Sequence, residues 1–399
     1  MILIKRLKIK TILPILFTLC FCYPSFGQSN KIKGFEIAHL SPRPALVSNV
    51  QQPQISLNGK WDFRIAGRNT KHIINVPGEW EMQGFTVNEG ETAVYTRELN
   101  IPADWEGKTI RIRFDGVSSH AIIKVNGIKI GEHEGSFVPF ERDITSAAKE
   151  NKNILQVEVQ ALTISDRLAC LSQYAAHTVG GILRKVTLFV LPEVYITSSV
   201  VNTIFDKKYK NATLQLNTKI NNLSSSVATE LRYTLTDSSE KKVFQKTFLI
   251  TETIEDDHQS IEIKNPKPWN PEHPYLYWLT VELFVNGKWS QTNNQHVGFR
   301  QIGIRGNQLL VNGRPIKLHG VNRHSIYPLT GRSITPELDR KDAELFRNAN
   351  CNFIRTSHYP PSEEFLNSCD SLGLFVESES SICWMEHSAS PVMQHRQRK

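Results

Sequence analysis

Two short clusters of polar side chains are the residues of this chain best suited to act together. They are Asn322, Arg323 and His324, and then Arg355, His358 and Tyr359. Together they would present two imidazoles and two guanidinium groups, which are hydrogen-bond donors and cations. Each cluster alone is also compatible with a structural role, because Arg and His at a strand end can cap a helix or form a buried ion pair. Their joint occurrence favours a functional site.

Predicted β-strands place both clusters. A strand near residues 316–321 leads into the first cluster, and a strand at 352–356 leads into the second. A third strand is predicted at 374–377, and helical segments separate the three. Strand, helix, strand, helix, strand is the opening of a parallel α/β fold, which places active-site residues at the carboxyl ends of its strands. The two clusters should therefore meet at one rim.

Capping residues bound the two predicted helices. Thr335 and Pro336 are an N-cap and first-turn pair for a helix that runs to about Asn350. Ser362 caps the second helix, and Gly373 ends it. Four residues are predicted to form the apolar face of this helix: Phe365, Leu366, Cys369 and Leu372.

The chain upstream of these elements is predicted to be all β. From Ser56 to about Tyr195, alternating segments surround a tight hairpin turn at Asn126-Gly127, which indicates a sandwich of jelly-roll type. Residues 196–298 have the length and strand spacing of an immunoglobulin-like sandwich. Four prolines there must cross a sheet edge or join sheets: Pro266, Pro268, Pro271 and Pro274. We divide the chain into residues 1–27, 28–195, 196–298 and 299–399.

The first 27 residues have the pattern of a secretory signal peptide. Four cations precede an apolar run from Thr11 to Cys22, and small residues at Ser25 and Gly27 fit a cleavage site. We therefore expect a periplasmic or secreted protein. Removing this segment lowers the formal net charge from +8 to +4, because it carries four cations and no acid. The remainder lacks the basic stripe that binding of nucleic acid requires.

Cysteine usage excludes a disulfide scaffold and offers no metal motif. Two of the six cysteines lie in the predicted signal peptide. The other four are scattered: Cys170, Cys351, Cys369 and Cys383. No CxxC or HxxxH spacing suggests a metal site, and we expect no cofactor.

Several segments of the chain resemble glycoside hydrolase family 2. NFIRTSHYPPSEEFLNSCDSLGLFVE (352–377) closely resembles the family's first signature, in which Asn and Arg precede His-Tyr-Pro. LHGVNRHSIYP (318–328) is similar to the family's first barrel strand, especially in its β-galactosidase branch. Upstream, LNGKWDF, VPGEW, GILRKVTLFV and PWNPEHPYLY resemble its jelly-roll and immunoglobulin-like domains. The resemblance covers residues 56–385 and implies that the last region begins a (β/α)₈ TIM barrel and holds about its first three strands.

The resemblance implies roles for the two clusters. His324 and His358 would contact sugar hydroxyls or the charge that develops in the transition state, and Arg355 would lie beside the nucleophile. Asn322 and Tyr359 are further candidates for substrate binding. Asn322 and Arg323 are each as compatible with a structural role as with contact to the sugar.

The family hydrolyses β-linked terminal sugars with retention, which takes two carboxylic acids about 5 Å apart. By resemblance these are glutamates at the ends of the fourth and seventh barrel strands, and this sequence has no counterpart of either after its third strand. We interpret residues 386–399 as an abrupt ending and expect the chain alone to be inactive. Glu377 and Glu379 could replace the missing pair, but a supporting role for both fits better because one strand end offers no opposite wall.

The expected ligand is a β-linked carbohydrate. Relatives specific for galactose carry acids and a Trp near residues 170–183, where this chain has Gln173, Ala175 and His177, so galactose specificity does not follow. The competing hypotheses are a non-catalytic carbohydrate-binding protein and a misfolded product, since three barrel strands leave an unpaired edge. Relatives often assemble through their β domains, so a homo-oligomer is a further expectation from the resemblance.

Overall fold

The computed structural model describes five stretches and two dipeptide strands. The stretches are residues 50–149, 151–175, 177–221, 227–250 and 256–383, and the strands are β1 (Lys31–Ile32) and β2 (Phe35–Glu36), which pair antiparallel. The chain divides into two compact units, Met1–Ile37 and Ala38–Lys399. The predicted signal peptide and the predicted abrupt ending lie outside the described residues. None of the helices described here has the length and apolar character to cross a bilayer.

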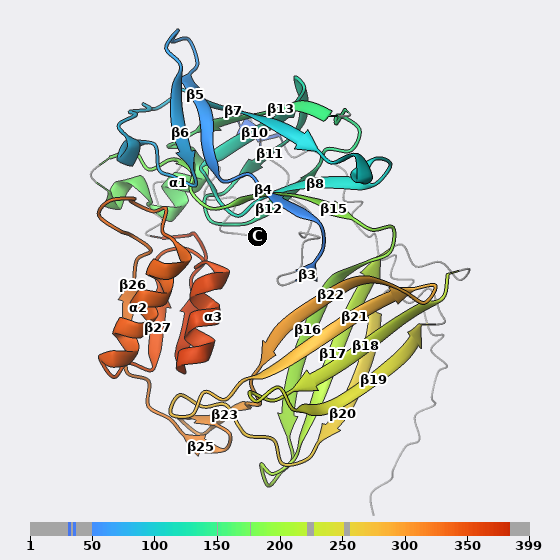
Figure 1. The fold of residues 1–399 in the computed structure, drawn as a ribbon. Helices are drawn as coiled ribbons and strands as arrows, with labels where there is room; N and C mark the ends of the chain where they lie inside the picture. The colour runs from blue at the N-terminus through green and yellow to red at the C-terminus, as the bar shows by residue number, and fades with distance from the viewer. Residues whose placement is uncertain are drawn as a thin grey trace, which may run out of the picture. The chain divides into compact units, whose positions relative to one another are not determined.

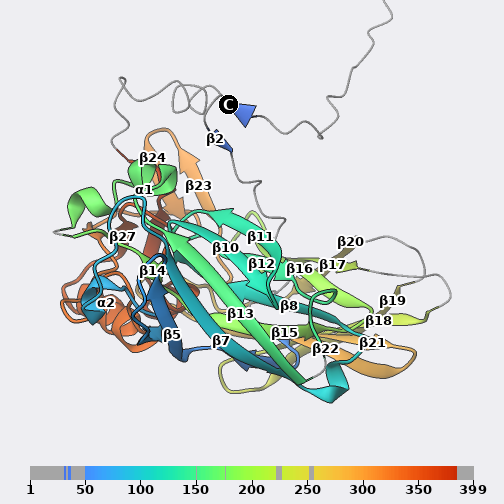
Figure 2. The same cartoon turned by 90° about the horizontal axis from the view of Figure 1, so that it is seen from above.

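The first β region is a sandwich of two antiparallel sheets (Figure 1). The larger sheet has the order β11 (Ile128–Glu134), β10 (His120–Val125), β13 (Asn151–Gln160), β7 (Ala93–Ile101), β5 (Gly59–Ile65), β6 (His72–Val76). The smaller sheet has the order β12 (Phe140–Asp143), β8 (Thr109–Phe114), β15 (Val186–Leu191), β4 (Gln54–Ser56). The strands β9 (Val117–Ser118) and β14 (Gly181–Ile182) pair separately. Figure 2 shows β5, β7 and β13 side by side, as their register requires.

Local sequence explains the predicted hairpin in this sandwich. Asn126 and Gly127 have φ values of 51° and 80°, so both central residues of the turn are left-handed, as a tight hairpin requires. The turn fixes Val125 opposite Ile128. Because side chains alternate across a strand, Val125 and every second residue before it face the buried core. The hairpin prediction is confirmed.

The second β region is also a two-sheet sandwich, which confirms the predicted fold class for this part. One sheet has the order β16 (Tyr195–Phe205), β17 (Ala212–Asn221), β20 (Asp256–Ile263). The other has the order β19 (Lys242–Ile250), β18 (Thr229–Thr236), β21 (Tyr277–Val285), β22 (Lys288–Val297), β3 (Val50–Gln51). The edge strand β3 comes from the segment before the jelly roll, since Gln51 pairs with Thr292. That segment therefore joins two β domains.

The proline-rich stretch of the second sandwich carries a contact to the α/β region. Trp269 is buried, and its indole Nε1 donates to the Asp370 carbonyl at 2.8 Å. Its ring meets Phe375 edge-on at a centroid distance of 5.3 Å. The prolines thus shape a connection between the regions rather than a central strand.

Three parallel strands form the centre of the last region. A small antiparallel sheet comes first, made of β23 (Ile302–Arg305), β24 (Gln308–Val311) and β25 (Arg314–Pro315). The strands β26 (Gly320–Arg323), β27 (Phe353–Thr356) and β28 (Phe375–Ser378) follow and pair in that order. The first of them begins four residues later than predicted, so Asn322 and Arg323 lie inside β26 rather than beyond it, and Arg355 lies inside β27.

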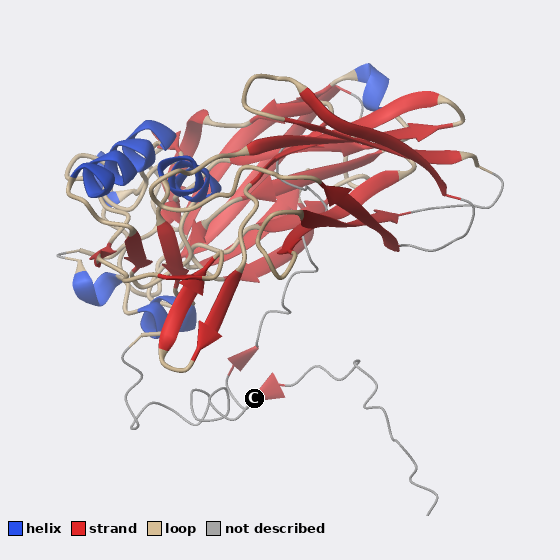
Figure 3. Ribbon diagram, turned by 90° about the horizontal axis from the view of Figure 1, so that it is seen from below, coloured by secondary structure: helices blue, strands red, loops and turns tan. Residues whose placement is uncertain are grey.

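Helices α2 (Pro336–Asn348) and α3 (Glu363–Leu372) lie side by side, and Figure 3 shows them among a fold that is mostly strand. The predicted caps are present: Thr335 and Ser362 each accept a hydrogen bond from the backbone three residues on. Gly373 ends α3 with φ of 75°. Of the predicted apolar face, Leu366 is 37% exposed, so it lies outside the core that Phe365 and Cys369 enter.

Phe365 and Leu366 offer a matched test of this packing. Phe365 is fully buried with Ile354 and Ala343, so Phe365→Ala should lower the local free energy of unfolding by about 3–5 kcal/mol. Leu366→Ala, in the next position of the same helix, should cost less than about 1 kcal/mol because that side chain stays partly in water. Hydrogen exchange of peptides covering residues 353–376 measures both. Equal losses for the two variants would contradict the assigned packing.

Candidate functional site

The two predicted imidazoles meet at the carboxyl ends of β26 and β27. His324 follows β26, His358 follows β27, and their ring centroids lie 4.9 Å apart at an angle of 42°. Both side chains are partly exposed. Burial lowers the pKa of His324 below its usual 6.5, and the nearby Arg332 and His358 side chains lower it further. His324 is therefore a neutral imidazole at pH 7, able both to donate and to accept a hydrogen bond.

The parallel register adds Asn322 and Arg355 to the same side of the sheet. These two residues are directly opposite each other in the β26–β27 ladder. Ile354, the neighbour of Arg355, packs under the helices, so Arg355 points to the opposite face of the sheet. Asn322 is exposed there. We call His324, His358, Asn322 and Arg355 the rim.

Glu377 in β28 and Glu379 directly after it do not face each other across the rim. Glu379 forms an ion pair with the Arg355 guanidinium, and its side chain is 19% exposed. Glu377 is exposed and lies opposite Arg355 in the β27–β28 ladder. Both come from one strand end, so in these positions they cannot flank a sugar from two sides. Glu379 is therefore the ion-pair partner of Arg355 in the rim.

Arg323 belongs to the packing beneath the rim. Its side chain is 2% exposed, and its guanidinium bonds to Asp339 at 2.7 Å and to Asp342 at 2.8 Å. It also lies 4.0 Å from the ring centre of Phe365. A buried guanidinium with two carboxylate partners fixes α2 against β26, which is the structural alternative that the sequence left open.

Tyr359 is a correction to the predicted set of substrate contacts. It is 2% exposed and stacks on Phe137 of the jelly roll with ring centroids 3.8 Å apart. Its hydroxyl accepts from Arg332 at 3.1 Å and donates to the Ser325 carbonyl at 3.2 Å. The hydroxyl both accepts and donates a hydrogen bond inside the protein. Tyr359 therefore links the α/β region to the jelly roll, and its side chain is not part of the rim.

The jelly roll contributes a residue that the sequence did not single out. Tyr174, in the short helix η3 (Ser172–Tyr174), stacks on His358 with ring centroids 5.3 Å apart and an angle of 14°. At the edge of the ring, His358 Nδ1 lies 2.6 Å from Cys383 Sγ. No local sequence signal links positions so far apart. These contacts fix the orientation of the imidazole.

A buried carboxylate of the jelly roll holds the loop that follows β26. The Glu79 side chain is fully buried, accepts from the Arg332 backbone N–H at 2.8 Å and contacts His177 Nε2. Gly331, with φ of 60°, leaves the space that this carboxylate fills, because a Cβ there would overlap it. His177, one of the residues that differ from galactose-specific relatives, therefore pairs inside the protein.

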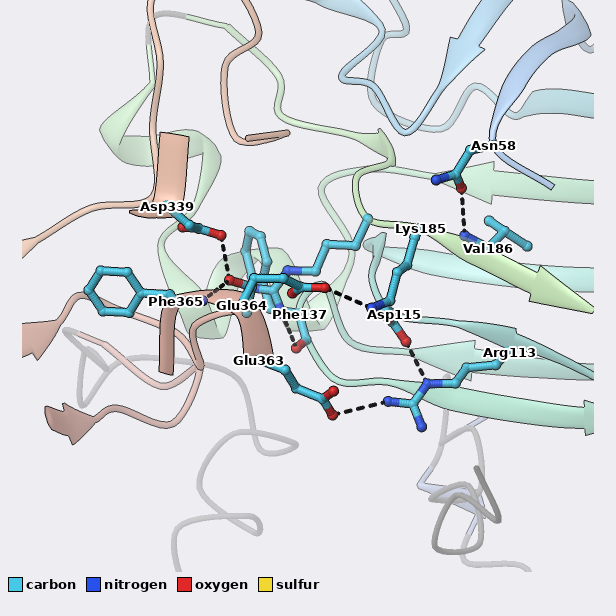
Figure 4. Close-up of polar contacts among 12 residues, drawn as sticks. Asn58, Arg113, Asp115, Phe137, Lys185, Val186, Asp339, Glu363, Glu364 and Phe365 are labelled. Atoms are coloured by element: carbon cyan, nitrogen blue, oxygen red, sulfur yellow. Dashed lines mark hydrogen bonds and ion pairs between the residues drawn. The ribbon is translucent and has the colours of Figure 1, made fainter. Parts of the chain in front are cut away.

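Ion pairs also join the jelly roll to the start of α3. Figure 4 shows Arg113 and Lys185 of the jelly roll reaching Glu363 and Glu364, at 3.5 Å and 2.8 Å, with Asp115 bound to both cations. The carboxylates in the first turn of α3 also complement its helix dipole. This network lines a cavity of about 770 Å³ between the jelly roll and the starts of α2 and α3. Arg113 and Lys185 are both paired with carboxylates here, so this cavity is a junction between the jelly roll and the α/β region.

Comparison with known proteins decides the family. The family description "Glycosyl hydrolases family 2, sugar binding domain" matches residues 54–192, "Glycosyl hydrolases family 2" matches 194–300, and "Glycosyl hydrolases family 2, TIM barrel domain" matches 302–396. The chain belongs to glycoside hydrolase family 2. It is 35% identical over 294 residues to a β-galactosidase of Thermoanaerobacterium thermosulfurigenes, covering 71% of this chain and 40% of that protein.

Solved structures of two β-glucuronidases share the fold. A β-glucuronidase of Bifidobacterium dentium complexed with coumarin-3-O-glucuronide matches with a TM-score of 0.74 at 25% identity, over 89% of this chain and 65% of that one. A β-glucuronidase of Bacteroides uniformis matches with a TM-score of 0.72 at 26% identity, over 87% and 44%. The chain spans about 40% of the length of the curated relatives it matches. Within the described residues, no group of three or more His, Cys, Asp or Glu is arranged to hold a metal ion.

The charges around His324 give a matched pair of substitutions. Glu379 raises the pKa of His324, whereas burial and nearby cations lower it. Glu379→Gln should therefore lower this pKa further, and Glu377→Gln should leave it unchanged. Because protonation costs more in the folded state, acidification through pH 6.5 should also weaken the fold more in Glu379→Gln. Histidine NMR titrations test this, and equal shifts in the two variants would contradict the geometry.

Proposed function

We propose that this chain binds the terminal sugar of a β-glycoside at the rim, as part of an exported retaining β-glycosidase most similar to β-galactosidases. The observation that carries the proposal is the meeting of His324 and His358 beside Asn322 and Arg355. Neutral imidazole and amide groups suit the hydroxyls of a pyranose, because each can donate and accept a hydrogen bond.

The chemistry of the rim supports binding rather than bond cleavage by this chain. Retaining hydrolysis needs a nucleophile and an acid/base on opposite sides of the glycosidic bond. Arg355 supplies a fixed positive charge that would keep a neighbouring carboxylate ionised. In this structure that positive charge is already paired with Glu379. Glu377 lies at the same end of β28, so the two glutamates cannot act from opposite sides. We propose that the glutamates which break the bond are those that family resemblance assigns to later barrel strands.

The identity of the sugar is the finer part of the proposal. The similarity to a β-galactosidase favours a β-galactoside. His177, in the segment where galactose-specific relatives are expected to reach the sugar, is engaged with Glu79 instead. A β-glucuronide is therefore the second substrate to compare, since two structurally similar proteins are β-glucuronidases.

Calorimetry with the purified chain tests the binding proposal. Methyl β-galactoside and methyl β-glucuronide should be compared, and His358→Ala should weaken binding of the preferred one by about tenfold to hundredfold through lost hydrogen bonds. His258→Ala is the matched control, because His258 is exposed on β20 of the second sandwich. Loss of affinity in both variants, or in neither, would argue against the rim.

Turnover assays distinguish sugar binding by this chain from cleavage of the glycosidic bond. Aryl β-galactoside, β-glucuronide and β-mannoside should all remain uncleaved, since the described rim presents no opposed pair of carboxylic acids. Cleavage that disappears in Glu377→Gln or Glu379→Gln would overturn this expectation and make the chain an enzyme by itself.

Export is tested by cell fractionation and intact mass. Expressed in a Gram-negative host, the chain should appear in the periplasm with Gln28 as its first residue, because the cationic and apolar segments precede small residues at Ser25 and Gly27. A variant with Lys5, Arg6, Lys8 and Lys10 changed to Glu should stay in the cytoplasm. An unprocessed wild-type chain in the cytoplasm would refute the export proposal.

A further inference from the structure

Two cysteines that are far apart in the sequence meet beside the rim. Cys170 caps the carboxyl end of α1 (Ile164–Ala169) in the jelly roll, and Cys383 follows β28. The Cys170 thiol donates to the Cys383 carbonyl at 3.2 Å, and the Cys383 N–H donates to the Leu168 carbonyl at 2.7 Å. The two sulfur atoms are also close enough to interact with each other. Both sulfurs are thiols in this structure.

The geometry around the pair places both sulfurs for thiol–disulfide exchange. Cys383 is partly exposed, and its Sγ lies 2.6 Å from His358 Nδ1, which can accept the thiol proton. Cys170 is 5% exposed but lines an open hollow of about 480 Å³ with Asp166 and His177. The Cys383 sulfur is therefore accessible and lies beside His358. The Cys170 sulfur is held close to it, in position to complete the exchange.

We propose that Cys170 and Cys383 form a reversible disulfide when the chain meets a low-molecular-weight disulfide, tying α1 of the jelly roll to the segment that follows β28. The Cys383 thiol loses its proton, and the resulting thiolate attacks one sulfur of the small disulfide and releases one thiolate. Cys170 then loses its proton and attacks Cys383 Sγ, forming the protein disulfide and releasing the second thiolate. Two protein thiols are oxidised, one small disulfide is reduced, and the two protons end on the released thiols.

The disulfide would act on the rim as well as on the domain junction. In the reduced chain, His358 Nδ1 lies 2.6 Å from the Cys383 sulfur, and a thiol that donates to Nδ1 keeps the imidazole proton on Nε2. Oxidation removes this donor and frees Nδ1 to take another tautomer or a proton. The inference is independent of sugar binding and of export, because it rests on the thiol geometry alone.

Mass spectrometry of the folded full chain tests the disulfide directly. After exposure to about 1 mM oxidised glutathione, the intact mass should fall by about 2 Da from one internal bond, and later alkylation should add two fewer groups than in the reduced chain. Digestion with trypsin and Glu-C should give the linked peptides 168–184 and 380–386, which separate Cys383 from Cys369. Burial raises the pKa of the Cys383 thiol to about 11, so the rate should rise about tenfold between pH 7 and pH 8.

Matched variants make the result decisive. Cys170→Ser and Cys383→Ser should each abolish the bond, whereas Cys351→Ser should form it at the wild-type rate because Cys351 lies at the opposite end of β27. Unfolding the chain in urea before oxidation should remove the preference for this pair. A folded wild-type chain in which Cys170 and Cys383 are alkylated or glutathionylated separately, with no linked peptide, would overturn the proposal.

Discussion

The parallel pairing of β26 with β27 is the constraint on which the rest of the site depends. It sets Asn322 opposite Arg355 and brings His324 and His358, from separate loops, into ring contact. The pairing is possible because α2 and α3 cover the other face of the sheet, where Ile354 is buried. A one-residue slip would turn Arg355 toward the helices and bury its charge without a partner.

The jelly roll is the second support of the site. Tyr174 stacks on one imidazole, and Glu79 holds the loop after β26 through the Arg332 backbone. Ion pairs from Arg113 and Lys185 fix the start of α3. The rim is therefore a product of two domains, and the α/β region alone would lose the stacking and the buried carboxylate that orient it.

Local rules predicted much of this structure from the sequence. The Asn-Gly hairpin, the caps at Thr335 and Ser362 and the end of α3 at Gly373 depend on neighbouring residues, and all appear as predicted. The sequence did not reveal contacts that join distant segments. Tyr174 reaches His358 across two domain boundaries, and Tyr359 is drawn out of the predicted rim by its stacking on Phe137. Such contacts depend on how domains pack, which no local pattern encodes.

The most direct test of the rim is an NMR titration of the wild-type chain with methyl β-galactoside and, in parallel, methyl β-glucuronide. Because His324 and His358 are in ring contact, their ring C–H resonances should shift together with one dissociation constant for the preferred sugar. The exposed His258 should not move. If the folded chain shows no shift of either rim histidine with either sugar, or shifts of only one, the account of a shared sugar site is contradicted.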